Sequence, residues 1–169
     1  VSLYEGGPEI GGVMRTGIPS YRLPREALDR EIDRIVGLGM ETIVDHRVDK
    51  EELLQIAQKH DAVLVATGLQ ELRALRLGDV EDDAVMQGID FLDHVHRESV
   101  RVDGENVVVV GGGNTAFDAA RSSLRLGAKS VRMVYRRTRE EMPAIAEEID
   151  EGIEEGVQID YLTLPIQIK

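Results

Sequence analysis

An apolar run that stops on three consecutive glycines constrains the fold of this chain more than any other feature. Four valines lead into Gly111, Gly112 and Gly113, and a stretch rich in alanine follows. In a strand that turns directly into a helix, Gly111 permits the tight turn, Gly113 lets the backbone approach a pyrophosphate, and Ala116 lets the helix pack close to the strand. A helix start also leaves backbone N–H groups unpaired and carries a partial positive charge. The run 106–118 therefore predicts a cradle for the phosphates of a dinucleotide.

The residues after the next strand indicate which dinucleotide this is. NAD-binding domains place an acidic residue about 20 residues after the glycines, where it binds the ribose 2′-hydroxyl, whereas NADP sites use arginine to bind the 2′-phosphate. Here the expected strand 130–135 leads into Arg136 and Arg137, and no acid occurs between Lys129 and Arg139. A guanidinium group binds phosphate oxygens through paired hydrogen bonds, and a charged hydrogen bond contributes about 1.5–3 kcal/mol. We therefore expect NADP(H) to be preferred over NAD(H) by about one to two decades.

The glycine pattern by itself is not specific to dinucleotide binding. Similar turns occur in many loops and in methyltransferases, which bind a different adenosyl ligand. A strand-helix-strand unit can also keep its glycines only for packing. The setting favours nucleotide binding, because the pattern follows a strand, opens a helix and is followed by a strand that ends in paired arginines. Methyltransferases usually need an acid at the tip of that second strand, so the arginines argue against them.

Composition excludes several classes of function. With 169 residues, of which 42% are hydrophobic, the chain can form one medium domain or two small ones with a packed core. Cysteine is absent, so electron chemistry within these residues requires a bound organic cofactor rather than a disulfide, a thiol pair or a thiolate-bound cluster. The 32 acidic residues against 20 basic ones argue against nucleic acid as a partner. No apolar run is long enough to predict a membrane span, and the cytoplasm is the default location.

Strand-like and helix-like segments alternate along the chain. This alternation predicts an α/β fold with two Rossmann-like parallel sheets, one before about Gly68 and one after about Arg101. The chain opens at Val1 and stops just after a strand, so we expect a fragment with structure missing on both sides. The expected elements are strands at 1–5, 42–48, 61–68 (buried), 106–110, 130–135 and 157–162, helices at 24–37, 51–59, 89–97 and 143–156 (with Pro143 in the first turn), and irregular segments at 6–24 and 69–88.

Four motifs in order along the chain resemble a known family. They are GGVMRTGIPSYRLP at 11–24, VLVATG at 63–68, VGGGNTA at 110–116 and VYRRTREEMPA at 134–144. Together they resemble the small subunit of NADPH-dependent glutamate synthase and its relatives, which include the pyridine-nucleotide half of dihydropyrimidine dehydrogenase. The resemblance covers nearly the whole chain.

The resemblance implies a flavoprotein with two dinucleotide-binding domains, in which an NADPH domain interrupts an FAD domain. Residues 1–99 would be an incomplete FAD-binding domain with its connection, and residues 100–169 the NADP-binding domain. In this family NADPH reduces FAD, and electrons pass through iron–sulfur clusters to a partner, here a glutamate synthase large-subunit-like protein or another electron acceptor. The family's FAD fingerprint lies just before Glu5 and is not in this sequence. We therefore expect this chain to bind mainly NADP(H), and assign electron transfer to the longer protein.

The resemblance also implies which residues bind each cofactor, with no metal ligand and no catalytic side chain. For FAD, Glu5 would bind the adenosine ribose, Val48 would meet the adenine through its backbone, and Arg22 would reach the phosphates or the ring. Further FAD contacts would come from Gly12 and Val13 at the flavin and from Ala66, Thr67 and Gly68 at the pyrophosphate. For NADPH the implied residues are Gly111, Gly113, Asn114, Thr115 and Ala116 in the cradle, with Arg136 and Arg137 on the 2′-phosphate.

Several polar residues are also typical of ordinary structural roles. Without the resemblance, Glu5 is more typical of a solvated carboxylate than of a ribose ligand. For Asp118 there are two interpretations: it orients the nicotinamide, or, as we prefer, it is an acid that favours the first turn of a helix through the dipole. His94 and His96 would point to different faces of a helix, which argues against a metal pair. Arg137 and Arg139 are also consistent with surface charges, and the acids at 147, 148, 151, 154 and 155 are typical of a solvated helix face rather than of a catalytic carboxylate cluster. At the level of function, a non-catalytic nucleotide-sensing or docking module and a structural interaction domain remain alternatives.

Overall fold

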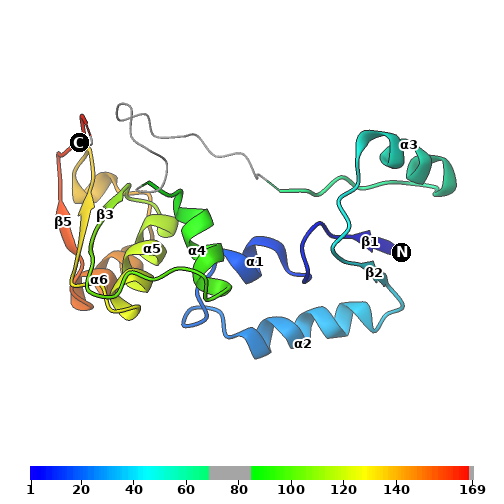
Figure 1. The fold of residues 1–169 in the computed structure, drawn as a ribbon, viewed down its shortest axis with the longest axis horizontal. Helices are drawn as coiled ribbons and strands as arrows, with labels where there is room; N and C mark the ends of the chain where they lie inside the picture. The colour runs from blue at the N-terminus through cyan, green and yellow to red at the C-terminus, as the bar shows by residue number, and fades with distance from the viewer. Residues whose placement is uncertain (69–84, 168–169) are drawn as a thin grey trace. The chain divides into compact units, whose positions relative to one another are not determined.

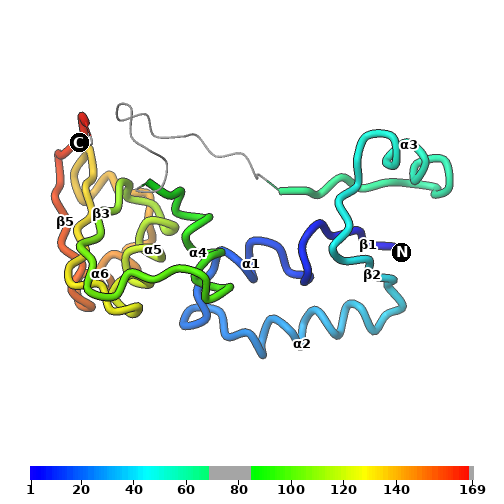
Figure 2. The backbone as a smooth tube through the Cα atoms, in the orientation of Figure 1, coloured from blue at the N-terminus to red at the C-terminus, as the bar shows by residue number. Residues whose placement is uncertain are grey.

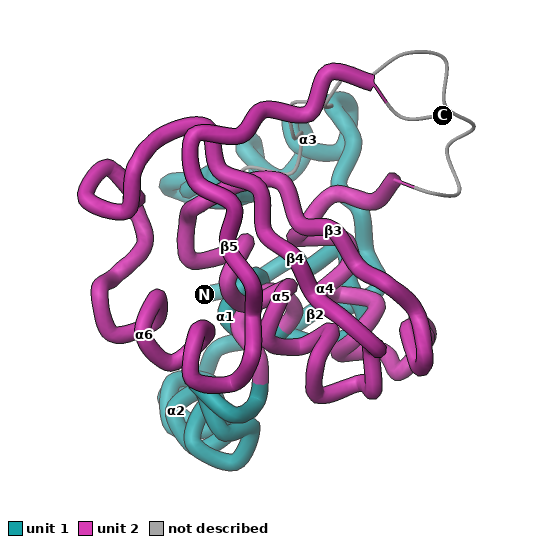
Figure 3. Tube along the Cα trace, turned by 90° about the vertical axis from the view of Figure 1, so that its left-hand side faces the viewer, with its two compact units in different colours: residues 1–15, 20–72 teal, residues 16–19, 73–169 magenta. Residues whose placement is uncertain are grey.

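The computed structural model describes residues 1–68 and 85–167, which form two compact units (Figure 1). One unit comprises Val1–Arg15 and Ser20–Leu72, and the other comprises Thr16–Pro19 and Arg73–Lys169 (Figure 3). Both contain parallel strands joined by helices, so the predicted α/β class with Rossmann-like sheets is confirmed. The domain boundary at residue 99 stays a prediction.

The second unit contains a parallel sheet in which the strands follow chain order. Strands β3 (Asn106–Val110), β4 (Ser130–Val134) and β5 (Gln158–Asp160) lie in the order β3-β4-β5. Helix α5 (Asn114–Arg125) connects β3 to β4 along the chain, and α6 (Ala146–Glu154) follows β4 and precedes β5. Both helices are labelled in Figure 2. Because parallel crossovers are right-handed, strands added in chain order place both helices on the same face of the sheet. The carboxyl ends of β3 and β4 meet at one edge, since Val110 pairs with Val134.

The core of this unit lies between the sheet and α5. Phe117 of α5 and Val131 and Met133 of β4 are fully buried. On β3, Val107 and Val109 pack against this core, whereas Val108 and Val110 are exposed on the other face. This alternation is the period of two that a strand imposes.

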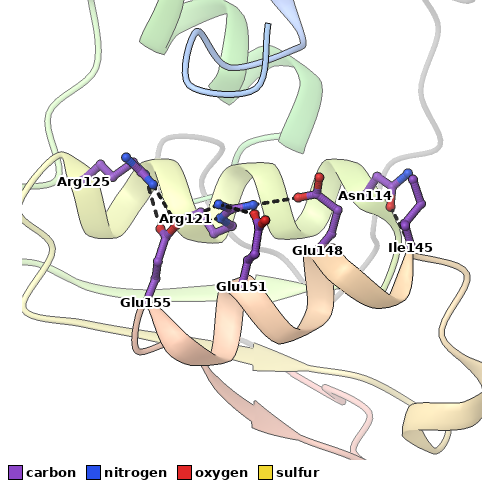
Figure 4. A network of polar contacts seen from close by, with 7 residues as sticks. All are labelled: Asn114, Arg121, Arg125, Ile145, Glu148, Glu151 and Glu155. Atoms are coloured by element: carbon purple, nitrogen blue, oxygen red, sulfur yellow. Dashed lines mark hydrogen bonds and ion pairs between the residues drawn. The ribbon is translucent and has the colours of Figure 1, made fainter.

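Helices α5 and α6 are joined by an ion-pair network around Arg121 (Figure 4). The Arg121 side chain is only 5% exposed, and its guanidinium nitrogens lie 2.7, 2.8 and 2.7 Å from carboxylate oxygens of Glu148, Glu151 and Glu155. Arg125 also contacts Glu155, at 2.7 Å. Of the acids predicted to form a solvated face, Glu148, Glu151 and Glu155 pair with Arg121, although Glu151 remains 55% exposed. The prediction missed this because Arg121 comes from a different helix.

Packing between these helices also requires a glycine. A Cβ atom on Gly152 of α6 would lie 2.8 Å from Cδ1 of Phe117.

Helix α4 (Gly88–His96) confirms the helix predicted at 89–97. It packs against α5 and buries Leu92. The 3₁₀ helix η2 (Arg139–Glu141) precedes α6, and Pro143 lies between the two rather than in the predicted first turn of α6.

The first unit has a smaller sheet. Strands β1 (Ser2–Tyr4) and β2 (Glu41–Ile43) pair in parallel, and α2 (Arg25–Val36) connects them. Helix α3 (Lys50–Lys59) begins at its N-cap Asp49, whose carboxylate accepts a hydrogen bond from the Glu52 N–H at 2.9 Å. The short helix α1 (Gly12–Thr16) interrupts the segment 6–24 that was predicted to be irregular.

Two strand predictions in the first unit were wrong. Residues 61–68 form no strand and are exposed, with Leu64 89% accessible, although their apolar character predicted a buried strand. A strand needs a neighbour for its N–H and C=O groups, and the β1–β2 sheet does not pair with this segment. The strand predicted at 42–48 ends at Ile43, because Asp45 adopts a positive φ of 53° that leaves the extended conformation. The predicted connection 69–88 falls mostly outside the described residues.

Candidate nucleotide-binding site

The turn after β3 begins at Gly111. This residue has φ of +147°, which L-residues rarely adopt, and its N–H donates to the carbonyl oxygen of Val134 at 3.2 Å. A Cβ atom on Gly111 would lie 3.3 Å from Cβ of Ala116. The first glycine therefore serves the turn, and the small side chain of Ala116 allows α5 to start close to the strand, in line with the expected packing roles.

The second glycine has a role that the sequence reasoning missed. A Cβ atom on Gly112 would lie 2.6 Å and 2.7 Å from Cδ2 and Cε2 of the Tyr135 ring. Side-chain contacts this short do not occur in stable structures, so Tyr135 requires a glycine at position 112. The available signal was the unbroken run of three glycines together with an aromatic residue at the end of the next strand.

The third glycine faces open space. Gly113 has φ of −93°, an ordinary value for any residue, and an added Cβ atom would meet only Cγ of Pro143, at 4.0 Å. Neither backbone conformation nor packing therefore requires glycine there. A cradle in which the backbone approaches a phosphate does require it. The structure thus fits a dinucleotide phosphate at this position.

Helix α5 begins without a side-chain cap. Gly113 is its N-cap, and its carbonyl oxygen accepts from the N–H groups of Ala116 at 2.9 Å and Phe117 at 3.2 Å, but a glycine has no side chain that could cap the first turn. The N–H groups that open a helix have no intrahelical partner, and they face outward at the positive end of the helix dipole. This end of α5 is therefore suited to bind an anion.

Asn114 and Thr115 occupy the first turn of α5. The Oδ1 atom of Asn114 accepts a hydrogen bond from the Ile145 N–H at 2.9 Å (Figure 4). Because a backbone N–H can only donate, this bond fixes the orientation of the amide and leaves its NH₂ end as a donor. The Thr115 side chain is exposed, and its Cγ2 atom lies 3.3 Å from the place that a Cβ atom on Gly88 would take.

Arg136 and Arg137 follow β4 at the same sheet edge as the glycine turn. Both are exposed, and within residues 1–68 and 85–167 neither side chain has a hydrogen bond or an ion pair with another protein group. Their neighbours differ. Arg132 lies 3.4 Å from Asp160, and Arg139 is paired with Asp150, whose hydrogen bond raises the pKa of the Arg139 guanidinium.

The local excess of positive charge in the sequence is therefore partly neutralised by distant acids. The acids at 150 and 160 lie on α6 and β5, outside the acid-free stretch 129–139. The two arginines of this stretch without a partner among the described residues are those assigned to the 2′-phosphate. Which arginines of this stretch are neutralised depends on tertiary contacts, so it could not be predicted from the local sequence.

Asp118 does not occupy the first turn. Helix α5 starts at Asn114, so Asp118 stands in the second turn, and it is only 4% exposed. The interpretation of this acid as a partner of the helix dipole is therefore wrong, because the helix begins at Asn114, directly after the glycine run, and the effect of the dipole is confined to the first turn.

In the first unit, the residues that the sequence assigns to FAD lie on several segments, and their role stays a prediction. The Glu5 carboxylate accepts a hydrogen bond from the Gly7 N–H at 2.7 Å, so it stabilises the turn after β1. Gly12 opens α1 with φ of +50°, and Val13 beside it is 46% exposed. The other residues implied for FAD are the half-buried Arg22 and Val48 and the exposed Ala66, Thr67 and Gly68, the last with a positive φ of 72°.

Arg15 is a structural residue that the sequence reasoning missed. Its side chain is 12% exposed and donates to the Ile10 carbonyl at 2.7 Å and to the Asp29 carboxylate at 2.5 Å. A Cβ atom on Gly11 would lie 3.1 Å from Cβ of Arg15. Gly11, the first residue of the 11–24 motif, thus makes room for an arginine that joins this loop to α2. The spacing of glycine and arginine four residues apart was the available signal.

Side chains that could bind a metal ion do not converge in the described part of the chain. Within residues 1–68 and 85–167, no group of three histidines or carboxylates could hold such an ion. His94 Nδ1 instead lies 2.8 Å from Ser99 Oγ. No helix among the same residues is long and apolar enough to cross a membrane.

Comparisons with known proteins place this geometry in a family. NADPH-Fe(3+) oxidoreductase subunit beta of Geobacter sulfurreducens is 41% identical over 174 residues, which cover 99% of this chain and 26% of that protein. Glutamate synthase [NADPH] small chain of Escherichia coli is 31% identical over 179 residues, covering 99% of this chain and 38% of that protein. The chain thus spans a quarter to two fifths of these relatives.

The fold is also that of a solved oxidoreductase. FprA from Mycobacterium tuberculosis in complex with NADPH superimposes with a TM-score of 0.80 at 17% identity, over 99% of this chain and 53% of FprA. The resemblance to the glutamate synthase small subunit is confirmed by the curated relatives. The sequence profile of the pyridine nucleotide-disulphide oxidoreductases matches residues 19–165, and the chain therefore belongs to that family.

Proposed function

We propose that this chain provides the NADPH-binding part of a flavin-dependent oxidoreductase. The observation that carries the proposal is the sheet edge where the glycine turn meets two exposed arginines that have no partner in the part of the chain that the structure describes. Relatives whose names specify NADPH support this choice of nucleotide. When bound, NADPH supplies a hydride and FAD accepts it.

The pyrophosphate would lie at the start of α5. Gly113 leaves room for it, the uncapped N–H groups of the first turn donate to its oxygens, and the NH₂ end of Asn114 adds a side-chain donor. Thr115 is exposed beside these groups, and Gly111 and Ala116 hold the turn against the strand. These contacts are common to NADPH and NADH, so they determine affinity rather than preference.

The preference for NADPH would come from Arg136 and Arg137. A dinucleotide that crosses the carboxyl edge of β3 reaches the end of β4 with its adenosine ribose. There the two guanidinium groups are exposed and have no protein partner in the described part of the chain, so binding a 2′-phosphate breaks no existing ion pair. This is the physical basis for expecting a gain from the extra phosphate.

The first unit would contribute to an FAD site in the longer protein. The residues assigned to it are Glu5, Gly12, Val13, Arg22, Val48, Ala66, Thr67 and Gly68. Electrons would then pass to a partner, either a glutamate synthase large-subunit-like protein or another electron acceptor, in the cytoplasm. The small-chain relatives support a large-subunit partner within the family.

Nucleotide titration tests the proposal. We expect NADPH to raise the melting temperature of the chain more than NADH does at equal concentration, because only NADPH carries the 2′-phosphate. Equal shifts would contradict the role of the arginines, and no shift with either nucleotide would favour a structural interaction domain.

A second experiment separates the enzyme from a nucleotide-sensing module. The longer protein, loaded with FAD, is mixed with NADPH under anaerobic conditions while flavin absorbance is recorded. Bleaching of the flavin supports hydride transfer. NADPH binding without bleaching would support the sensing module instead.

A further inference from the structure

Tyr135 is held in place from several directions. It stands directly after β4, is 8% exposed, and donates from its hydroxyl to the Glu141 carbonyl oxygen at 2.7 Å. Its backbone N–H donates to the Asp160 carbonyl at 2.9 Å, and its own carbonyl accepts from the Thr163 N–H at 2.9 Å. The hydroxyl is therefore held by η2, and the backbone of Tyr135 by β5 and the residues that follow it.

The ring lies against the glycine turn. It takes the space that a Cβ atom on Gly112 would need, with Cδ2 only 2.6 Å from that place. Gly112 does not adopt the left-handed conformation that would favour glycine for its own sake. The ring is thus the physical reason for glycine at position 112.

The hydroxyl of Tyr135 is bonded to a segment that also contacts the glycine turn. Glu141, whose carbonyl oxygen accepts from the Tyr135 hydroxyl, is the last residue of η2. The segment that follows η2 contacts the glycine turn. There the Ala144 N–H donates to the Gly112 carbonyl at 3.2 Å, and the Ile145 N–H donates to Asn114 at 2.9 Å. The turn is consequently enclosed between the ring and residues 144–145.

We infer that Tyr135 is a positioning residue that sets the separation between the glycine turn and the arginine pair. It touches the turn through Gly112 and is bonded directly to Arg136, so its ring links the groups that would bind the two ends of the adenosine diphosphate. This inference rests on the proposed function. It assigns Tyr135 an effect on nucleotide preference without a contact to the nucleotide.

Substitutions at position 135 test the inference. Dissociation constants for NADPH and NADH are measured on the folded chain, with the melting temperature as a separate readout. We expect Tyr135→Leu to reduce the preference for NADPH by about threefold or more, as coupled neighbouring residues do. Tyr135→Phe keeps the ring and should restore the preference, although it lowers the melting temperature through loss of the Glu141 hydrogen bond.

A double-mutant cycle provides a second test that does not depend on one variant folding. Gly112→Ala should weaken binding of both nucleotides in the wild-type background and weaken it less when Tyr135 is leucine, because the added methyl group then has room. Additive effects of the two substitutions would overturn the inference. So would a Tyr135→Leu protein that is less stable but keeps the full preference for NADPH, since Tyr135 would then only fill the core.

The proposed function fails in a distinguishable way. A wild-type chain that binds NADPH and NADH equally would remove the preference itself, and the role of Tyr135 with it. A wild-type preference that is lost in Arg136→Ala and kept in Tyr135→Leu would leave the proposed function standing and overturn only the inference.

Discussion

Arg121 and the pair Arg136–Arg137 carry the same side chain in opposite situations. The guanidinium of Arg121 is buried between two helices and surrounded by three carboxylates, whereas the pair is exposed and has no protein partner within the described residues. A buried ion that is fully paired holds its neighbours in place, and its loss leaves the partner charges uncompensated. An unpaired cation beside an open turn is available to a ligand. Stability and nucleotide preference should therefore depend on different arginines.

The largest expected effect is on stability. Arg121→Ala should lower the free energy of unfolding by about 3–5 kcal/mol, because three carboxylates lose their common partner between α5 and α6. Urea unfolding measures this change. Arg125→Ala is the matched control, since that side chain is 48% exposed and should contribute about 0.2–1 kcal/mol. Equal losses in the two variants would show that burial does not distinguish these arginines.

The next effect is on nucleotide preference. Arg136→Ala should weaken NADPH binding by about 1.5–3 kcal/mol and leave NADH binding and the melting temperature unchanged. Calorimetric titration with both nucleotides checks this expectation. Arg139→Ala removes an arginine from the same segment that is already paired with Asp150, so its preference should stay that of the wild type. A loss of preference in this control would mean that net charge, not position, attracts the nucleotide.

Asn114→Asp sharpens the comparison at the start of α5. The carboxylate can still accept from the Ile145 N–H, and an acid in the first turn stabilises a helix by about 0.3–1 kcal/mol, so the fold should be kept. The negative charge beside the pyrophosphate should weaken NADPH and NADH alike, by about tenfold or more. Parallel titrations measure both. Unchanged affinity would show that the side chain of Asn114 does not face the phosphates.

The smallest effect concerns pH. Burial raises the pKa of Glu155, but hydrogen bonds from Arg121 and Arg125 outweigh it and hold this pKa below the ordinary glutamate value of about 4.3. A carboxyl group with a lower pKa in the folded state stabilises fully above its unfolded value, and this stabilisation is lost as the pH falls through the folded value.

Glu155→Gln should therefore be less stable than the wild type at about pH 7, and the difference should shrink below about pH 4. Urea unfolding at several pH values measures it. Glu147→Gln, which changes an exposed acid on the same helix, is the matched control for the substitution itself. A constant difference for Glu155→Gln would mean that its charge does not contribute.

Local chemistry made much of the second unit predictable. The strand, glycine turn and helix at 106–125 follow from apolar residues, φ-permissive glycines and alanines that are adjacent in sequence. The position of Arg136 and Arg137 at the same edge follows from parallel pairing of β3 with β4. The curated relatives also confirm the family resemblance, which rested on four motifs rather than one.

The contacts that failed prediction depend on residues distant in sequence. Asp160 and Asp150 neutralise Arg132 and Arg139 from later elements, and Arg121 collects carboxylates from α6. The apolar segment 61–68 has the composition of a buried strand, but hydrophobicity does not specify a pairing partner. The sequence pattern therefore does not predict which side chains from different helices and strands pair with one another.

The contact between Gly112 and Tyr135 restricts the order in which substitutions at these two positions can be accepted during evolution. While the tyrosine is present, any larger residue at position 112 meets the ring, so a change of the glycine is tolerated only after the aromatic residue has become smaller. If the tyrosine is shortened first, the site holds a gap rather than a clash, and a larger residue at position 112 then has room. Homologous chains that have lost the tyrosine should thus be the ones in which the middle glycine varies.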